Sequence, residues 1–181
     1  KTLNKLLIKH IQKNNSYESS KLLVWLFIQE NRFESALDYE ISIDKRFGEN
    51  KTDILTLGEI TFKNQDYTTA IKAFKYILNK SHKNSYAYEY SAIQLLNIDF
   101  LILKNKKQKT KIEIKKLIEQ YENHIEVLGI KSETIPSIKN YTYLLSNYLN
   151  KADTAIVFLK TDIPNKTLIK VLCLYMRWSY I

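Results

Sequence analysis

The sequence has very few of the residues that make tight turns. Only 3 glycines and 2 prolines occur in 181 residues. An all-β protein needs many more of them, because its frequent tight turns depend on these residues. With 45% hydrophobic residues, the chain can nevertheless bury a substantial core. We therefore predict an all-α fold of helices joined by short polar links.

Other features that would indicate a particular class of protein are also missing. A single cysteine, Cys173, cannot form an internal disulfide, and its apolar neighbours indicate a small buried side chain. The longest apolar run, residues 22–28, is too short to cross a bilayer. The chain begins at Lys1 without a signal-peptide pattern, so we expect it to be a processed or excised portion of a longer product.

Patterns typical of enzymes are lacking as well. The three glycines are isolated, so there is no phosphate-binding loop, and no nucleophile elbow occurs. His10, His82 and His124 are far apart, without a second ligand at metal-binding spacing, and are expected in solvent or at helix ends. Glutamate pairs one turn apart, such as Glu122 with Glu126, indicate a solvated helix face. We expect no catalytic residue, no metal and no cofactor.

The net charge of +9 is unevenly distributed. Residues 104–116 contain seven lysines and one glutamate, a local charge of +6, whereas residues 30–59 carry eight acids and four bases, a charge of −4. The basic stretch is either a solvated loop or an anion-binding patch for nucleic acid, acidic lipid or an acidic partner. It has no arginine and no interleaved aromatic residue to stack on bases. Its lysines are Lys104, Lys106, Lys107, Lys109, Lys111, Lys115 and Lys116.

Two stretches of the chain are similar to each other at a distance of 34 residues. The sequence NRFESALDYEISI spans residues 31–43 and aligns with residues 65–77 of the stretch NQDYTTAIKAFKYIL, which begins one residue earlier, at residue 64. A fixed period with matching residue character is the signature of stacked helical repeats. The matching pairs are Leu23 with Leu57, Phe33 with Tyr67, Ala36 with Ala70, Leu37 with Ile71, and Ile43 with Ile77.

Each copy has the pattern of two short helices and a tight turn. In the second copy a helix is predicted over residues 53–63, with Gly58 where a neighbouring helix can approach closely. Asp66 is a plausible N-cap for the next helix. The apolar residues of that helix fall on one face, and they are Tyr67, Ala70, Ile71, Phe74, Ile77 and Leu78.

This pattern resembles the tetratricopeptide repeat (TPR). The family's 34-residue unit has a leucine–glycine pair in its first helix, matched by Leu57 and Gly58, and an aromatic, an alanine and an aromatic in its second, matched by Tyr67, Ala70 and Phe74. The copy at residues 17–50 departs from it, with Val24 in the glycine position and Glu40 in the second aromatic position. A degenerate copy at residues 131–164 has Ala155 and Leu159 in place of Ala70 and Phe74, and Ala152 where the first aromatic belongs.

The remaining segments are also expected to be helical. Residues 85–130 form an enlarged, irregular helix pair, with a capping box at Thr110 and Glu113 and a stop at Gly129. Tyr86, Tyr88 and Tyr90 cannot all face the same way on a helix, so at least one should reach the surface. Residues 1–16 are expected to form a leading helix, and residues 165–181 the first helix of a further repeat or a partner-packed end.

The resemblance implies a right-handed α-solenoid of antiparallel helix pairs, which binds a peptide or partner subunit on its concave face. The implied groove residues are Lys21, Trp25, Ile28, Gln29, Leu55, Glu59, Phe62 and Lys63. Trp25 and Phe62 are the expected anchors, because buried aromatic residues contribute much interface energy. Lys21, Glu59 and Lys63 would then select partner charge or peptide termini.

The sequence therefore predicts a non-enzymatic interaction scaffold within a larger bacterial assembly, with a protein or peptide partner and no small-molecule substrate. The order of elements is similar to that of bacterial cell-envelope TPR proteins, which implies the periplasm or the outer membrane, with the cytoplasm as the alternative. Two other functions remain open. One is an anion-binding module acting through residues 104–116, and the other is an accessory module that regulates a catalytic partner.

Overall fold

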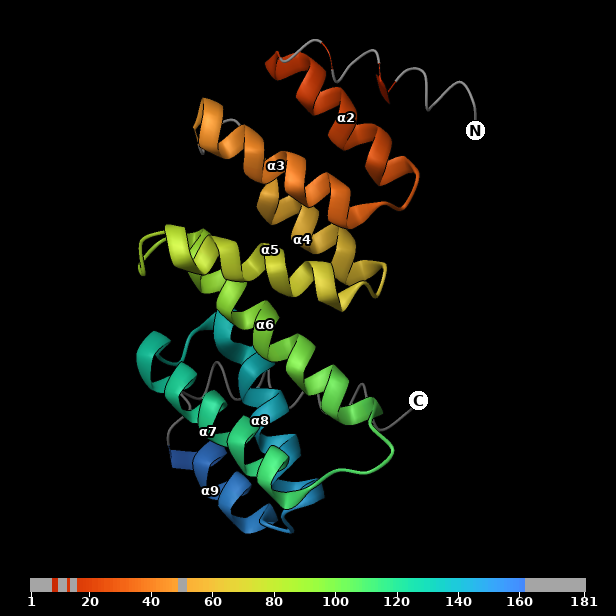
Figure 1. Cartoon of the computed structure of the whole chain (residues 1–181). Coiled ribbons are helices and arrows are strands. Elements are labelled where there is room, and N and C mark those ends of the chain that lie inside the picture. Colours follow the sequence, from red (N-terminus) through yellow and green to blue (C-terminus); the bar gives the residue numbers. More distant parts are fainter. Residues whose placement is uncertain (1–7, 10–12, 14–15, 49–51, 162–181) are drawn as a thin grey trace. The chain divides into compact units, whose positions relative to one another are not determined.

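The structure is a computed structural model that describes residues 8–9, 13, 16–48 and 52–161. Over these residues the chain folds into helices and short turns, without a strand (Figure 1). The prediction of an all-α fold is confirmed. The chain divides into two compact units, unit 1 (residues 1–91) and unit 2 (residues 92–181). The boundary falls within α6 (Tyr86–Asn105).

Unit 1 contains two helical hairpins. The first consists of α2 (Tyr17–Gln29) and α3 (Phe33–Phe47), and the second of α4 (Ile54–Lys63) and α5 (Tyr67–Lys80). The two helices of each hairpin lie against each other, and α3 also packs on α4 (Figure 1). Residues 17–47 and 54–80 thus form two consecutive helical hairpins.

The two hairpins turn in the same way, and the equivalent residues are 34 positions apart. Asn31 and Gln65 have positive φ angles, 56° and 63°. The following amide donates to a carbonyl five residues earlier, Arg32 to Phe27 at 2.8 Å and Asp66 to Thr61 at 2.9 Å. This is the Schellman arrangement, which satisfies the last carbonyls of a helix. The sequence period thus corresponds to a repeated backbone conformation.

The second hairpin closes around Gly58. A Cβ atom at this position would lie only 2.8 Å from Cε1 of Phe74, whose side chain is fully buried. Glycine is therefore needed here because the Phe74 ring lies directly against the α4 backbone. Ala70 is also fully buried on this side of α5. The predicted N-cap is confirmed, since the Asp66 carboxylate accepts a hydrogen bond from the Thr69 amide at 3.1 Å.

Glu40 occupies the second aromatic position of the first repeat, and the fold explains how a charge is tolerated there. Its side chain is fully buried. One carboxylate oxygen accepts from Lys21 Nζ at 2.8 Å, and the other accepts from the Asp53 amide at 3.0 Å. A buried carboxylate requires such partners, because desolvation alone would be costly. Glu40 therefore links α3 to α2 and to the beginning of α4.

Unit 2 contains most of α6, from residue 92 on, followed by α7 (Lys111–Leu128), the short 3-10 helix η2 (Ser132–Thr134), α8 (Ile135–Tyr148) and α9 (Ala152–Thr161). The predicted capping box is present, since Glu113 N donates to Thr110 Oγ1 at 3.2 Å and Thr110 N donates to Glu113 at 3.0 Å. The helix ends at Gly129, as predicted, with a φ of 73°. α8 packs against both α7 and α9.

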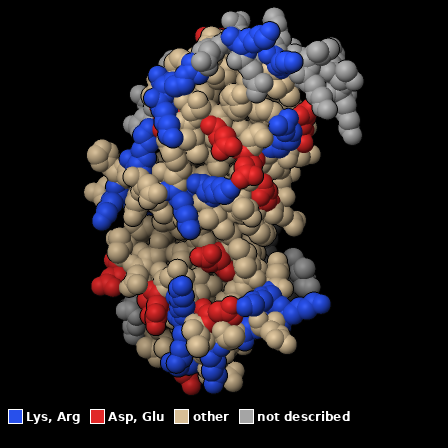
Figure 2. All heavy atoms as spheres, in the orientation of Figure 1, with Lys and Arg blue, Asp and Glu red and all other residues tan. Residues whose placement is uncertain are grey.

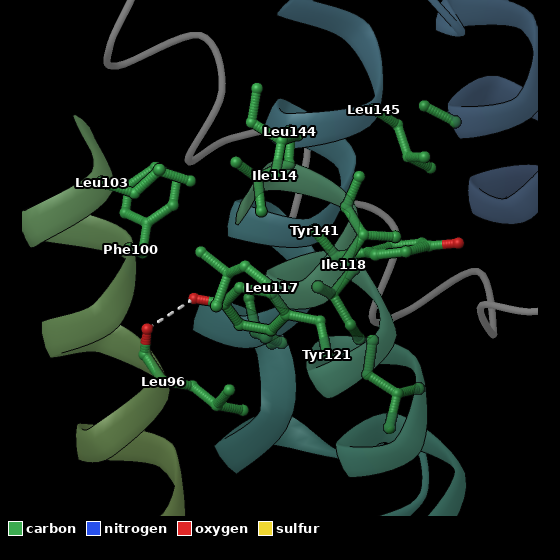
Figure 3. Packing of buried hydrophobic residues seen from close by; sticks show 14 residues of the cluster. Leu96, Phe100, Leu103, Ile114, Leu117, Ile118, Tyr121, Tyr141, Leu144 and Leu145 are labelled. Carbon is green, nitrogen blue, oxygen red and sulfur yellow. Dashed lines mark hydrogen bonds between the residues drawn. The ribbon is translucent and has the colours of Figure 1, made fainter. Parts of the chain in front are cut away.

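The core of unit 2 combines apolar packing with a polar network around Tyr121, and Figure 3 shows the apolar packing together with the hydrogen bond between Tyr121 and Leu96. Tyr121 of α7 is fully buried, and its hydroxyl donates to the Leu96 carbonyl of α6 at 3.0 Å. The Asn140 amide of α8 donates both to this hydroxyl, at 3.1 Å, and to Asn97 of α6, at 2.9 Å. The network therefore connects three helices at their common contact.

Some predicted elements lie outside the described residues. Most of the expected leading helix (residues 1–16) and all of the expected final helix (residues 165–181) belong there, as do His10 and Cys173. In the degenerate repeat, Ala155 is buried and Leu159 is half-buried on α9. Across the described part of the chain, no helix is both long and apolar enough to span a membrane.

Candidate functional site

The clearest candidate for a contact surface in unit 1 is the outer face of α2. Trp25 is 55% exposed, and Leu22, one turn before it, is 42% exposed. The opposite side of the same helix is buried in the core through Leu23, Leu26 and Phe27. The helix therefore carries apolar side chains on a face that is not buried in the core. We define Leu22 and Trp25 as the α2 surface.

The other predicted groove residues have varied environments. Ile28 and Leu55 are half-buried and pack against the same core cluster of unit 1. Phe62, the second expected anchor, is half-buried with its ring 6.0 Å from that of Tyr67 in its own hairpin. Glu59 is half-buried. The remaining two, Gln29 and Lys63, are exposed.

Lys21, a predicted groove residue, also forms two ion pairs within unit 1. Its ammonium group is bound by Glu40 and Asp53. Burial disfavours the charged form, but these two carboxylates raise the pKa of Lys21 above its ordinary value. The ammonium group is therefore held within unit 1, so a partner's carboxylate would have to compete with two existing ones.

Leu22 was not among the residues predicted from the sequence. The repeat pattern assigns positions relative to the expected concave face, and Leu22 has no assigned role in that pattern. The available signal was the run LLVWLFI at residues 22–28, which is longer than one buried helix face requires. Such a run indicates that some of its apolar side chains remain in solvent.

Unit 1 also contains a cavity of about 340 Å³ between the end of α3, the beginning of α4 and the end of α5. Asp44 lies at its edge with only 4% of its surface exposed. Tyr76 donates a hydrogen bond to this carboxylate, and Lys80 forms an ion pair with it. Further polar side chains line the cavity, namely Thr52, Ser81, His82 and Ser85.

The surroundings of Asp44 determine its pKa and that of its partner Tyr76. Burial favours the neutral acid, but the bonds from Lys80 and Tyr76 hold the pKa of Asp44 below its ordinary value. Burial and the same carboxylate raise the pKa of Tyr76 to about 12. All three groups therefore satisfy one another at neutral pH, and their role is to connect α3 to α5.

In unit 2, the basic stretch of residues 104–116 runs from the end of α6 into the beginning of α7, and two of its lysines contact aromatic rings of α8. Lys104 Nζ lies 6.0 Å from the centre of the Tyr143 ring, and Lys109 Nζ lies 5.7 Å from that of Tyr148. Burial, and then repulsion from Lys104, lower the pKa of Lys139, which is also on α8. The aromatic residues that the basic sequence lacks are thus provided by another helix.

The other lysines of this stretch differ in their contacts. Lys106 forms an ion pair with Glu113. This lysine, together with the amide and hydroxyl of Thr110, lowers the pKa of Glu113 to about 2. The remaining four are exposed, without an ion pair to any described residue, and they are Lys107, Lys111, Lys115 and Lys116.

Figure 2 shows lysine and arginine side chains interspersed with aspartate and glutamate on the face drawn. No group of three or more His, Cys, Asp or Glu side chains that could hold a metal occurs within the described residues. Tyr86 is 69% exposed, whereas Tyr88 and Tyr90 are half-buried, so one of the three tyrosines reaches the surface, as predicted.

Comparison with known proteins gives no match to the chain, whether with family models, with curated proteins or with solved structures.

Proposed function

We propose that the chain is a protein-interaction scaffold without enzymatic activity of its own, built as a right-handed TPR-like α-solenoid. The helical hairpins of unit 1 support this proposal through their 34-residue period, repeated turns and Gly58–Phe74 contact. Stacked hairpins of this kind offer an extended concave surface to another polypeptide. The proposed partner is a protein or peptide within a larger bacterial assembly of the cell envelope.

The observation that carries the proposal is the exposure of Trp25 beside Leu22. A tryptophan with 55% of its surface in water is costly to leave unpartnered, and tryptophan is strongly enriched among residues that dominate interface energies. The neighbouring Leu22 enlarges the apolar area by one helical turn. A partner that covers both side chains would remove this surface from water.

The test is partner capture with the full-length protein and matched variants. We expect Trp25→Ala to retain the helicity of the wild type and to weaken partner binding by about 1 kcal/mol or more, which is about fivefold in Kd. Leu22→Ala should weaken the same partners to a smaller extent. Ile102→Ala is the control, because Ile102 is 45% exposed on α6 in unit 2.

Quantitative mass spectrometry of captured proteins, followed by binding of the purified partner, would measure these differences. Partners that bind all variants equally would show that the α2 surface is not the contact. Unfolding of the Trp25→Ala variant would show that this residue belongs to the core.

A second candidate function is anion binding, and one specific observation favours it. The ammonium groups of Lys104 and Lys109 lie over tyrosine rings of α8, which combines positive charge with the aromatic surface typical of sites for single-stranded nucleic acid. Acidic lipid headgroups would satisfy the charge but not the rings.

This candidate is tested by retention of a single-stranded oligonucleotide, and of acidic vesicles, at increasing salt. Changing the four exposed lysines to glutamine should abolish retention and reduce the slope of log K against log salt. The four are Lys107, Lys111, Lys115 and Lys116. A matched control changes four exposed lysines of unit 1, which are Lys45, Lys63, Lys75 and Lys83. Equal losses in both variants would indicate only the net charge of the protein.

A further inference from the structure

Unit 2 has a pocket that none of the proposed functions uses. It has a volume of about 360 Å³ and opens between α7, α8 and α9. This volume falls within the range of small-ligand pockets. The lining residues combine two carboxylates with apolar and aromatic side chains, and they are Glu122, Ile125, Glu126, Ile130, Tyr141 and Phe158.

The inner part of this pocket is apolar. Ile125 and Tyr141 are almost completely buried, with 8% and 7% of their surface exposed. The ring of Phe158 from α9 meets the ring of Tyr141 edge to face, with 5.1 Å between their centres. Phe158 and Ile130 are half-buried, so part of each side chain still faces solvent. A chain of methylene groups could therefore rest on these surfaces.

The rim of the pocket is acidic. Glu122 and Glu126 are one turn apart on α7, and both side chains are exposed. The Tyr141 hydroxyl donates to Glu122 Oε1 at 3.0 Å, which fixes the position of one carboxylate. Among the described residues, neither glutamate forms an ion pair with a basic side chain. Two negative charges thus stand beside an apolar pocket without a cation.

We infer that this pocket binds an arginine side chain of a partner polypeptide. The guanidinium group is planar and carries five donors, so it can bridge two carboxylates and also lie against an aromatic ring. Its methylene stem would cover Ile125 and Phe158. Lysine offers only a point charge, and therefore uses the paired carboxylates and the rings less fully.

This site is separate from the α2 surface and does not depend on it, because it lies wholly within unit 2. It extends the proposed scaffold function by giving the chemistry of a second contact. The glutamates of α7, expected from the sequence to be only a solvated face, thereby acquire a ligand.

The test is a titration of the isotopically labelled full chain, followed by amide chemical shifts in NMR spectra. The probes are N-acetyl-arginine amide and N-acetyl-citrulline amide, which have nearly the same shape but differ in charge, and N-acetyl-lysine amide, which carries the charge without the planar guanidinium group. We expect arginine to shift amides of residues 122–130 and 158, and citrulline to bind at least about fivefold more weakly.

Matched variants show whether the two glutamates of the pocket are responsible for arginine binding. Glu122→Gln together with Glu126→Gln should reduce arginine binding to the level of citrulline. Glu119→Gln is the control, since Glu119 is exposed on the same helix and does not line the pocket.

Four results would overturn the assignment. Equal binding of citrulline would show that charge is not recognised, and an equal loss in the control would show diffuse attraction to the helix. Equal binding of N-acetyl-lysine amide would remove the preference for a guanidinium group. The absence of saturable shifts at residues 122–130 would rule out the site as well. None of these results bears on partner binding at Trp25.

Discussion

The contact between Gly58 and Phe74 allows a sharp test of how the second hairpin is packed. Adding a methyl group by Gly58→Ala brings it to 2.8, 3.1 and 3.2 Å from three ring atoms of Phe74. The ring has little room to move, because it is fully buried and the ring of Tyr90 packs against it at 6.5 Å between centres. Overpacking of this kind costs about 1–3 kcal/mol.

A second effect has the opposite sign. Alanine stabilises a helix interior by about 1 kcal/mol relative to glycine. The net effect of Gly58→Ala should therefore be a destabilisation of about 1 kcal/mol. If Phe74 is first changed to leucine, which itself costs about 1–2 kcal/mol, the ring atoms are gone. Gly58→Ala should then stabilise by about 1 kcal/mol, so that the two changes are coupled by about 2 kcal/mol.

Urea unfolding followed by far-UV circular dichroism gives the free energies of unfolding of the wild type, the two single variants and the double variant. Hydrogen exchange of α4 and α5 assigns the transition to the second hairpin. Phe27→Leu provides the matched background, because Phe27 is a buried aromatic of the same unit that packs on Tyr39 instead. There, Gly58→Ala should cost the same as in the wild type within about 0.5 kcal/mol. The reasoning is wrong if Gly58→Ala stabilises the wild type, or if its effect is unchanged by Phe74→Leu.

Two further predictions concern buried polar groups. Tyr121→Phe should lower the free energy of unfolding by about 1–2 kcal/mol, because it removes the buried hydroxyl that donates to the Leu96 carbonyl and accepts from Asn140, whereas the control Tyr86→Phe, at an exposed site, should have no effect in the same urea titration. The pKa of Asp44 is lowered from an ordinary value of 3.8, so its ion pair with Lys80 should stabilise the fold above that pH, and this contribution should be lost as the pH falls through the lowered folded pKa. Asp44→Asn should flatten the dependence of unfolding free energy on pH in this acidic range, and an unchanged slope would contradict the assignment.

The features predicted correctly from the sequence are those that depend on neighbouring residues. The N-cap at Asp66, the capping box of Thr110 with Glu113 and the helix stop at Gly129 each involve groups within one or two turns. The close approach at Gly58 followed from a glycine in an otherwise apolar helical pattern. Spacing along the chain contains the information needed for such features.

Features that depend on contacts between distant residues could not be predicted in the same way. The burial of Glu40 depends on Lys21, which is 19 residues away. The tyrosines near the basic stretch belong to α8, and Tyr143 is 39 residues beyond Lys104. On α2, Trp25 was predicted as a contact residue but Leu22 was missed for a related reason, since a repeat pattern assigns inward positions but gives no account of an additional apolar side chain.

The buried carboxylate of Glu40 makes the two hairpins of unit 1 poor substitutes for each other. In the second copy, its counterpart 34 residues later is Phe74, and the counterpart of Lys21 is Leu55. If gene conversion replaced the first copy by the second, the Asp53 amide would lose its acceptor. Exchanging the first copy for the second would therefore destabilise the junction between the hairpins, even though both copies share the same backbone turn.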